Sequence, residues 1–146
     1  MRRVGNQPPN GELTVRTVEE LISTTGVDVL DYLDRQAAVP VLRDPQIQGD
    51  ISILPAQDRA ASTPIPATGV VVATGRGGHD HRLLAGGCFD RSPAREGSLE
   101  IGVLTVPQGG EVFMAHDEHG FMGFAPGSYV VGRQREQADE IREVED

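Results

Sequence analysis

The first apolar pattern along the chain has the period of a helix. Thr17 is followed three residues later by Glu20, which is the spacing of a capping box at a helix start. The apolar positions that follow repeat every three to four residues, and Gly26 can end this first helix. A second helix, or a continuation of the first beyond a kink, is predicted over residues 27–36, before Pro40 stops it. The N-terminal part of the chain is therefore predicted to be helical.

From residue 47 on, the apolar pattern has the period of a strand. Apolar and polar residues alternate in short runs that glycine and proline interrupt. The predicted strands cover residues 47–55, 69–74, 79–84, 99–106, 111–115 and 127–135, and residues 85–98 are predicted to form a loop. The 18 glycines and 10 prolines also favour many turns over a helical bundle. We therefore predict a mainly β fold, a small barrel or sandwich of about six short strands, preceded by a short helical N-terminal segment.

The change of pattern divides the chain into four predicted parts. They are a flexible arm over residues 1–12, a helical appendage over residues 13–46, a β-domain over residues 47–136 and a charged tail over residues 137–146. The arm is polar and contains consecutive prolines, which is typical of a terminus without regular structure.

The charge of the chain excludes some classes of partner. The net charge is −9, and nonspecific nucleic-acid binding needs a basic face, so no nucleic-acid partner is expected. The predicted second helix carries three aspartates and only Arg35, which argues against a DNA-reading helix-turn-helix. No apolar run approaches the ~20 residues of a membrane span, and no hydrophobic stretch follows the basic N-terminus. We therefore expect a cytoplasmic protein, or a virion component, with no membrane partner.

A lone cysteine and two glycine- or arginine-rich segments are weaker candidates for function. Cys88 has no partner for an internal disulfide and is interpreted as a small buried hydrophobe rather than a reactive thiol. Gly75–Gly78 is interpreted as a hairpin turn or a bulge, since the lysine and helix of a phosphate-binding loop are absent. Arg133 and Arg135 share one face of the last predicted strand, where they could hold an anion or protect an exposed edge.

The four histidines form the best candidate site. They stand in two pairs, His79/His81 and His116/His119, separated by 35 residues. Residues two apart on a strand point to one face, and residues three apart are neighbours in a helical turn. Together the pairs could supply three or four nitrogen ligands to a divalent transition metal such as Zn, Fe, Mn or Ni. Glu118 is the candidate general base, or a carboxylate that orients an imidazole.

The same histidines have two other interpretations. Histidines next to glycine and aspartate in turns often only hydrogen-bond neighbouring backbone groups, which would make the cluster a structural polar network. Imidazoles also change charge near neutral pH, so the cluster could respond to pH instead of holding a metal.

Part of the histidine pattern resembles the cupins, which are small metal-binding β-barrels. Gly78–His81 would match their first motif, Pro107–Gly110 the turn between strands, and His116 or His119 the last ligand. The sequence departs from this pattern because no acidic residue stands near residues 85–87, where the cupin glutamate would fall. The resemblance implies a metal-binding barrel.

A second resemblance covers about two thirds of the chain. Residues 47–146 are similar to a group of small uncharacterised bacterial and phage-borne proteins. The shared motifs are Gln48-Gly49-Asp50, Gly78–His81, His116–His119, Pro126–Tyr129 and Gln134-Arg135-Glu136. This resemblance implies a domain that begins near residue 47, and it implies no activity.

Three functions follow from these observations as hypotheses. The first is a small metal-binding β-domain whose ligands are the four histidines. The second is a structural or interaction protein, such as a phage virion or capsid-associated component, that forms a homo-oligomer or binds a partner protein. The third is a regulator that docks its helical segment in a partner's groove.

Overall fold

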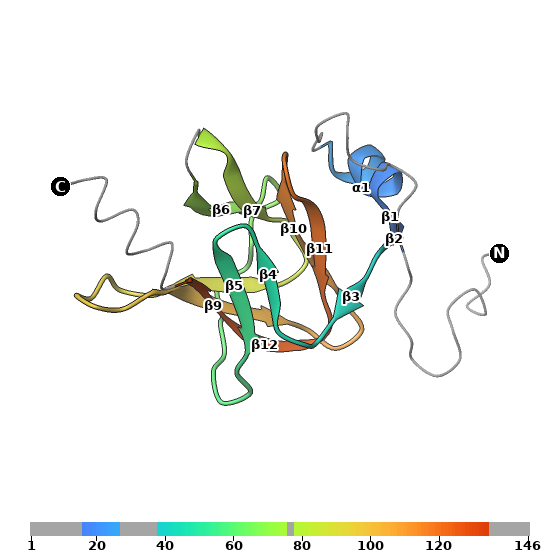
Figure 1. The fold of residues 1–146 in the computed structure, drawn as a ribbon. Helices are drawn as coiled ribbons and strands as arrows, with labels where there is room; N and C mark the ends of the chain where they lie inside the picture. Colours follow the sequence, from blue (N-terminus) through green and yellow to red (C-terminus); the bar gives the residue numbers. More distant parts are fainter. Residues whose placement is uncertain (1–15, 27–37, 76–77, 135–146) are drawn as a thin grey trace.

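Two five-stranded sheets form most of the structure. A computed structural model describes residues 16–26, 38–75 and 78–134 (Figure 1). The first sheet has the order β3 (Val41–Leu42), β11 (Gly120–Phe124), β10 (Val112–His116), β7 (Asp80–Leu83) and β6 (Val70–Thr74). The second sheet has the order β4 (Gln46–Gln48), β5 (Ile51–Pro55), β12 (Gly127–Arg133), β9 (Glu100–Val106) and β8 (Cys88–Arg91). Neighbouring strands are antiparallel, except that β3 runs parallel to β11.

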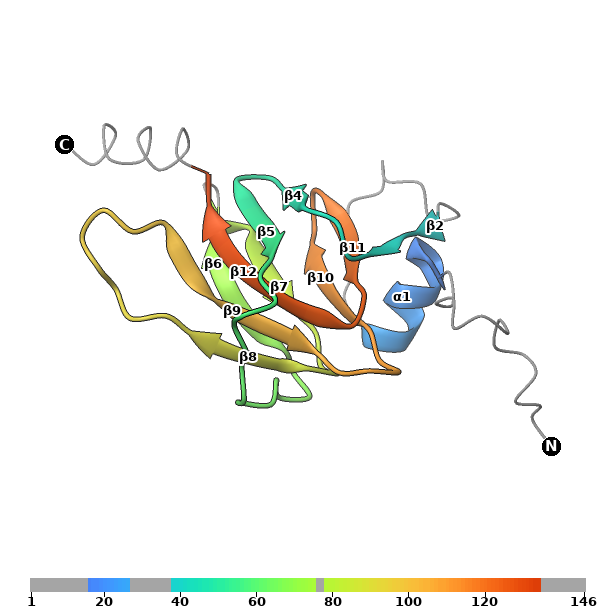
Figure 2. The same ribbon diagram turned by 90° about the horizontal axis from the view of Figure 1, so that it is seen from below.

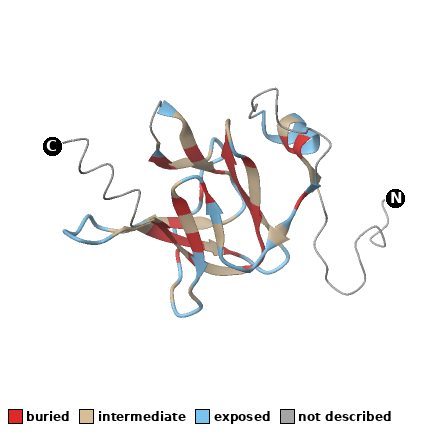
Figure 3. Ribbon diagram, in the orientation of Figure 1, coloured by how far each residue is buried: buried red, intermediate tan, exposed pale blue. Residues whose placement is uncertain are grey.

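The main hydrophobic core joins the two sheets. The second sheet contributes Ile51, Ile53 and Leu104, and the first contributes Leu83 and Met114, all of them fully buried. Figure 3 shows buried stretches in the strands of both sheets. The fold is therefore mainly β and sandwich-like, as predicted, and within the described residues the sheets do not close into a barrel.

A short helix covers the other face of the first sheet. The helix α1 (Val18–Thr25) follows β1 (Arg16–Thr17), which pairs with β2 (Ala38–Val39). The predicted capping box is present, because the Thr17 hydroxyl accepts a hydrogen bond from the Glu20 amide and the Glu20 carboxylate accepts one from the Thr17 amide. Figures 1 and 2 place α1 beside β11, where its apolar face packs in a second core cluster. That cluster has as its buried members Val18, Leu21, Val39 and Phe113.

Two predictions about single elements are wrong, and one strand was not predicted. The strand predicted over residues 47–55 is a hairpin, because β4 and β5 pair Gln48 with Ile51 around a two-residue turn. Gly49 takes a φ of +60° there, which glycine adopts without steric cost and which is typical of such turns. The loop predicted over residues 85–98 contains the edge strand β8, and β11 was not predicted at all.

The described part of the predicted appendage is not only helical. Besides α1 it contains β1, β2 and β3, which are two residues long and so too short to show a period. The second helix predicted over residues 27–36 lies outside the described residues, as do the arm over 1–12 and the tail over 137–146. None of the described helices has the length and apolar character needed to span a membrane.

Candidate metal centre

Two of the histidines extend the inner face of the first sheet beyond its apolar core. On β7, buried His81 and Leu83 alternate with the more exposed Asp80 and Arg82. Leu83 pairs with Met114 on β10, and His116 follows Met114 on the same face. The rings of His81 and His116 lie 4.4 Å apart between centroids, and the residues are only 1% and 4% exposed. The sandwich interior therefore changes from apolar side chains to imidazoles at this end.

The other two histidines join this pair from adjacent turns. The ring of His119, in the turn between β10 and β11, lies 4.4 Å from that of His116 and is stacked 6.5 Å from that of His81. The ring of His79, which directly precedes β7, lies 5.8 Å from that of His116. Two histidine pairs that are distant in the sequence thus meet at one place.

Acidic side chains of the β10–β11 turn contact His79. Its Nδ1 lies 2.8 Å from Oδ2 of Asp117, and its Nε2 lies 3.7 Å from Oε1 of Glu118. The hydrogen bond to Asp117 raises the pKa of His79. Oδ1 of Asp117 is also 2.8 Å from Nδ1, but that single N–H is directed to Oδ2, so Oδ1 lacks a hydrogen-bond donor among the described residues. A carboxylate on Nδ1 leaves Nε2 of His79 available to a ligand.

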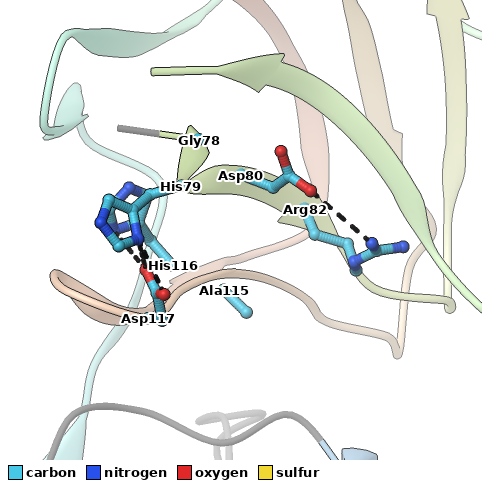
Figure 4. A pocket seen from close by; sticks show the side chains of 7 residues that line it. All are labelled: Gly78, His79, Asp80, Arg82, Ala115, His116 and Asp117. Atoms are coloured by element: carbon cyan, nitrogen blue, oxygen red, sulfur yellow. Dashed lines mark hydrogen bonds and ion pairs between the residues drawn. The ribbon is translucent and has the colours of Figure 1, made fainter. Parts of the chain in front are cut away.

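His79, His116 and Asp117 line an open cleft of about 210 Å³ (Figure 4). Figure 4 shows His79, His116 and Asp117 together on one side, while Asp80 and Arg82 form a separate ion pair at 4.0 Å. The cleft thus gives access from outside to the partly buried edge of the histidine cluster.

His116 is bonded differently from His79. Its Nδ1 accepts hydrogen bonds from the backbone amides of Glu118 and His119, both at 3.1 Å. Because Nδ1 uses its lone pair in this way, the proton of the neutral ring is on Nε2. Burial lowers the pKa of His116, and a charge on His119 acts in the same direction. The ring is therefore neutral at pH 7.

His81 is held by a residue that the sequence patterns did not single out as functional. Its Nδ1 lies 3.0 Å from Oε1 of Gln48, whose Nε2 donates to the carbonyl oxygens of Met114 and Gly120. Gln48 is itself 2% exposed, so the second sheet reaches directly into the cluster. Burial lowers the pKa of His81 to about 4, helped by the nearby His116.

The turn after Gln48 is shaped to fit the imidazoles. A Cβ atom added to Gly49 would stand 3.0 Å from Nε2 of His119 and 3.2 Å from Cε1 of His81. Next along the chain, Oδ1 of Asp50 lies 3.5 Å from Nε2 of His81. Gln48-Gly49-Asp50 was noted in the sequence only as a shared motif, and its place beside the histidines was not predicted.

One group within the cluster has ligand atoms near one another. His116, Glu118 and His119 each offer one ligand atom, and these atoms lie within 4.8 Å of each other. Two imidazoles and a carboxylate are donors that Zn, Fe, Mn and Ni accept. This group could hold a metal ion, and the rings of His81 and His79 lie next to that of His116.

The fold and the site together define a two-sheet β-sandwich with a histidine cluster at one end of its core. The chain belongs to a family described as a domain of unknown function (DUF8820), whose model matches residues 47–134. The matched segment contains all four histidines and the Gln48–Asp50 turn, and it excludes α1. The prediction of a family without an assigned activity is thereby confirmed, while the cupin resemblance stays a prediction. No curated protein and no solved structure matched the chain.

Proposed function

We propose that this protein binds one divalent transition-metal ion at the histidine cluster. The ligands are drawn from His79, His81, His116 and His119, and Glu118 serves as an oxygen ligand or as a base. The observation that carries the proposal is the meeting of the two histidine pairs, with centroids 4.4 Å apart for His81 and His116 and for His116 and His119.

The protonation states support metal binding. Metal ions bind the neutral form of imidazole, and burial lowers the pKa of both His81 and His116, which keeps them neutral at pH 7. The carboxylate of Asp117 on Nδ1 of His79 is an arrangement that is common behind metal-binding histidines.

His116 has to change its hydrogen bonds to join the ligands. Its Nε2 carries the proton while Nδ1 accepts from the amides of Glu118 and His119. Ligation through Nε2 therefore requires that its proton move to Nδ1 and that the two turn amides rotate away, whereas ligation through Nδ1 requires only that the amides rotate away. Zn²⁺ binding should accordingly shift the amide resonances of Glu118 and His119 more than those of α1.

Metal titration of the full chain tests the proposal. After EDTA treatment and its removal, Zn²⁺ and Co²⁺ should each bind at about one ion per chain at pH 7.5. The double variant His81→Ala/His116→Ala should lose this binding. Cys88→Ser is the matched control, because Cys88 is the only thiol in the chain and is half-buried on β8.

Two results would contradict the proposal. One is wild-type protein that takes up neither metal and melts at the same temperature in EDTA and in Zn²⁺. The other is loss of metal binding in Cys88→Ser while the double histidine variant still binds metal, which would mean that the thiol and not the histidine cluster holds the ion.

A further inference from the structure

We propose that Asp50 supplies a carboxylate ligand to this metal centre from the second sheet, and that Gln48 positions His81 to share the same ion. The inference rests on the proposed metal-binding function and extends its ligand set beyond the histidines and Glu118. It gives the Gln48-Gly49-Asp50 turn a role in binding.

The hydrogen bonds of Gln48 determine which nitrogen of His81 carries the proton. The amide nitrogen of Gln48 faces two carbonyl oxygens, those of Met114 at 3.2 Å and Gly120 at 3.3 Å, so it can only be the NH₂ group. Its other atom is then the oxygen, which accepts and cannot donate. Nδ1 of His81, at 3.0 Å from that oxygen, must therefore be the N–H. In the neutral ring this leaves the lone pair on Nε2.

That lone pair faces a carboxylate oxygen. Nε2 of His81 lies 3.5 Å from Oδ1 of Asp50. The other oxygen of Asp50 accepts a hydrogen bond from NH1 of Arg133 at 2.9 Å, so the arginine orients the carboxylate and leaves Oδ1 directed at the ring. The side chain of Asp50 is only 13% exposed. Two hydrogen-bond acceptors that face each other in a mostly buried place repel each other, and a positive charge between them removes this repulsion.

The separation of the two atoms fits a shared metal ion. Bonds of about 2.0–2.1 Å in a tetrahedral site put neighbouring ligand atoms about 3.4 Å apart. The distance from Nε2 of His81 to Oδ1 of Asp50 is 3.5 Å. Gly49 contributes by having no side chain, because a Cβ there would crowd both His81 and His119.

An ion held in this way would connect the two sheets. His81 belongs to the first sheet, whereas Asp50 stands in the turn between β4 and β5 of the second. Metal binding should therefore stabilise the sandwich against unfolding through both halves of the fold, not only through the β10–β11 turn.

The test compares two aspartate variants of equal charge change. Asp50→Asn removes the proposed ligand. Asp80→Asn is the control, because Asp80 bonds to Thr74 and Arg82 and stands apart from the histidine rings in Figure 4. In Zn²⁺ titrations at pH 7.5 we expect at least tenfold weaker binding for Asp50→Asn and less than twofold change for Asp80→Asn. The ¹⁵N spectrum of the metal-free protein should show the proton of His81 on Nδ1.

The outcomes separate this inference from the proposed function. If wild-type protein binds Zn²⁺ and Asp50→Asn binds it as tightly as Asp80→Asn, Asp50 is no ligand and the inference fails while the proposed function stands. If wild-type protein binds no metal, both fail. If Asp50→Asn does not fold, the ¹³C resonance of the Asp50 carboxylate in wild-type protein tests whether Asp50 binds the metal. A shift on Zn²⁺ addition supports ligation, and a constant position overturns it.

Discussion

Acidification should destabilise the metal-free protein through His81. Its pKa is about 4 in the folded state, because the ring is buried and near other imidazoles, against 6.5 for a free side chain. Between these values the unfolded chain binds the proton more readily than the folded one, so the free energy of unfolding falls as the pH falls. The contribution is complete above pH 6.5 and is lost by about pH 4. The shift corresponds to roughly 3 kcal/mol.

Two neighbouring histidines modify this pH dependence. The pKa of His116 is also lowered by burial, so its protonation destabilises the fold in the same direction. The pKa of His79 is raised by its hydrogen bond to Asp117, which acts in the opposite direction: its stabilisation is complete below pH 6.5 and is lost as the pH rises through the raised value. His79 is a more exposed group, so its part should be small.

The measurement is urea denaturation in EDTA at pH 7.0, 6.0, 5.0 and 4.5, for wild-type protein and His81→Asn. Asparagine keeps an N–H for Oε1 of Gln48 but does not titrate. Titratable groups remote from His81 are common to both proteins and cancel in the comparison. We expect wild-type protein to lose about 2 kcal/mol more than His81→Asn between pH 7.0 and 4.5, because the series stops just above the folded-state pKa. The reasoning would be refuted if the free energies of unfolding of the two proteins changed in parallel with pH, or if wild-type protein gained stability on acidification.

Three further substitutions test individual elements. Gly49→Ala should lower the melting temperature more than Gly97→Ala, because both positions have positive φ but only a Cβ at position 49 would contact imidazole atoms. Equal decreases in melting temperature would mean that the turn at Gly49 is not packed tightly against the histidines. Thr17→Ala should cost about 1 kcal/mol in urea denaturation by removing the cap of α1, and an unchanged midpoint would count against this role. Leu104→Ala should cost about 2–5 kcal/mol because Leu104 is fully buried in the main core, and a cost below that range would show that the cavity collapses.

The elements that could be predicted are those whose cause lies within a few residues. The capping box of Thr17 and Glu20 needs only a spacing of three, and both hydrogen bonds are present. The alternation over residues 99–106 corresponds to β9, since successive side chains of a strand point to opposite faces and give the sequence a period of two. β11 has no such pattern, because its sequence, GFMGF, presents phenylalanine to both faces: Phe121 packs with the helix cluster and Phe124 in the main core.

At the candidate site, residue type and spacing predicted the four histidines as ligands and Glu118 as their acidic neighbour, because these histidines are the only imidazoles of the chain and stand in two closely spaced pairs. Residue type and spacing do not predict that Gln48 and Asp50 lie beside the histidines. Gln48 meets His81 across 33 residues of sequence, through the registers of two different sheets and the way those sheets pack. Contacts of that kind depend on how distant strands are brought together, so they are visible only once the sandwich is assembled.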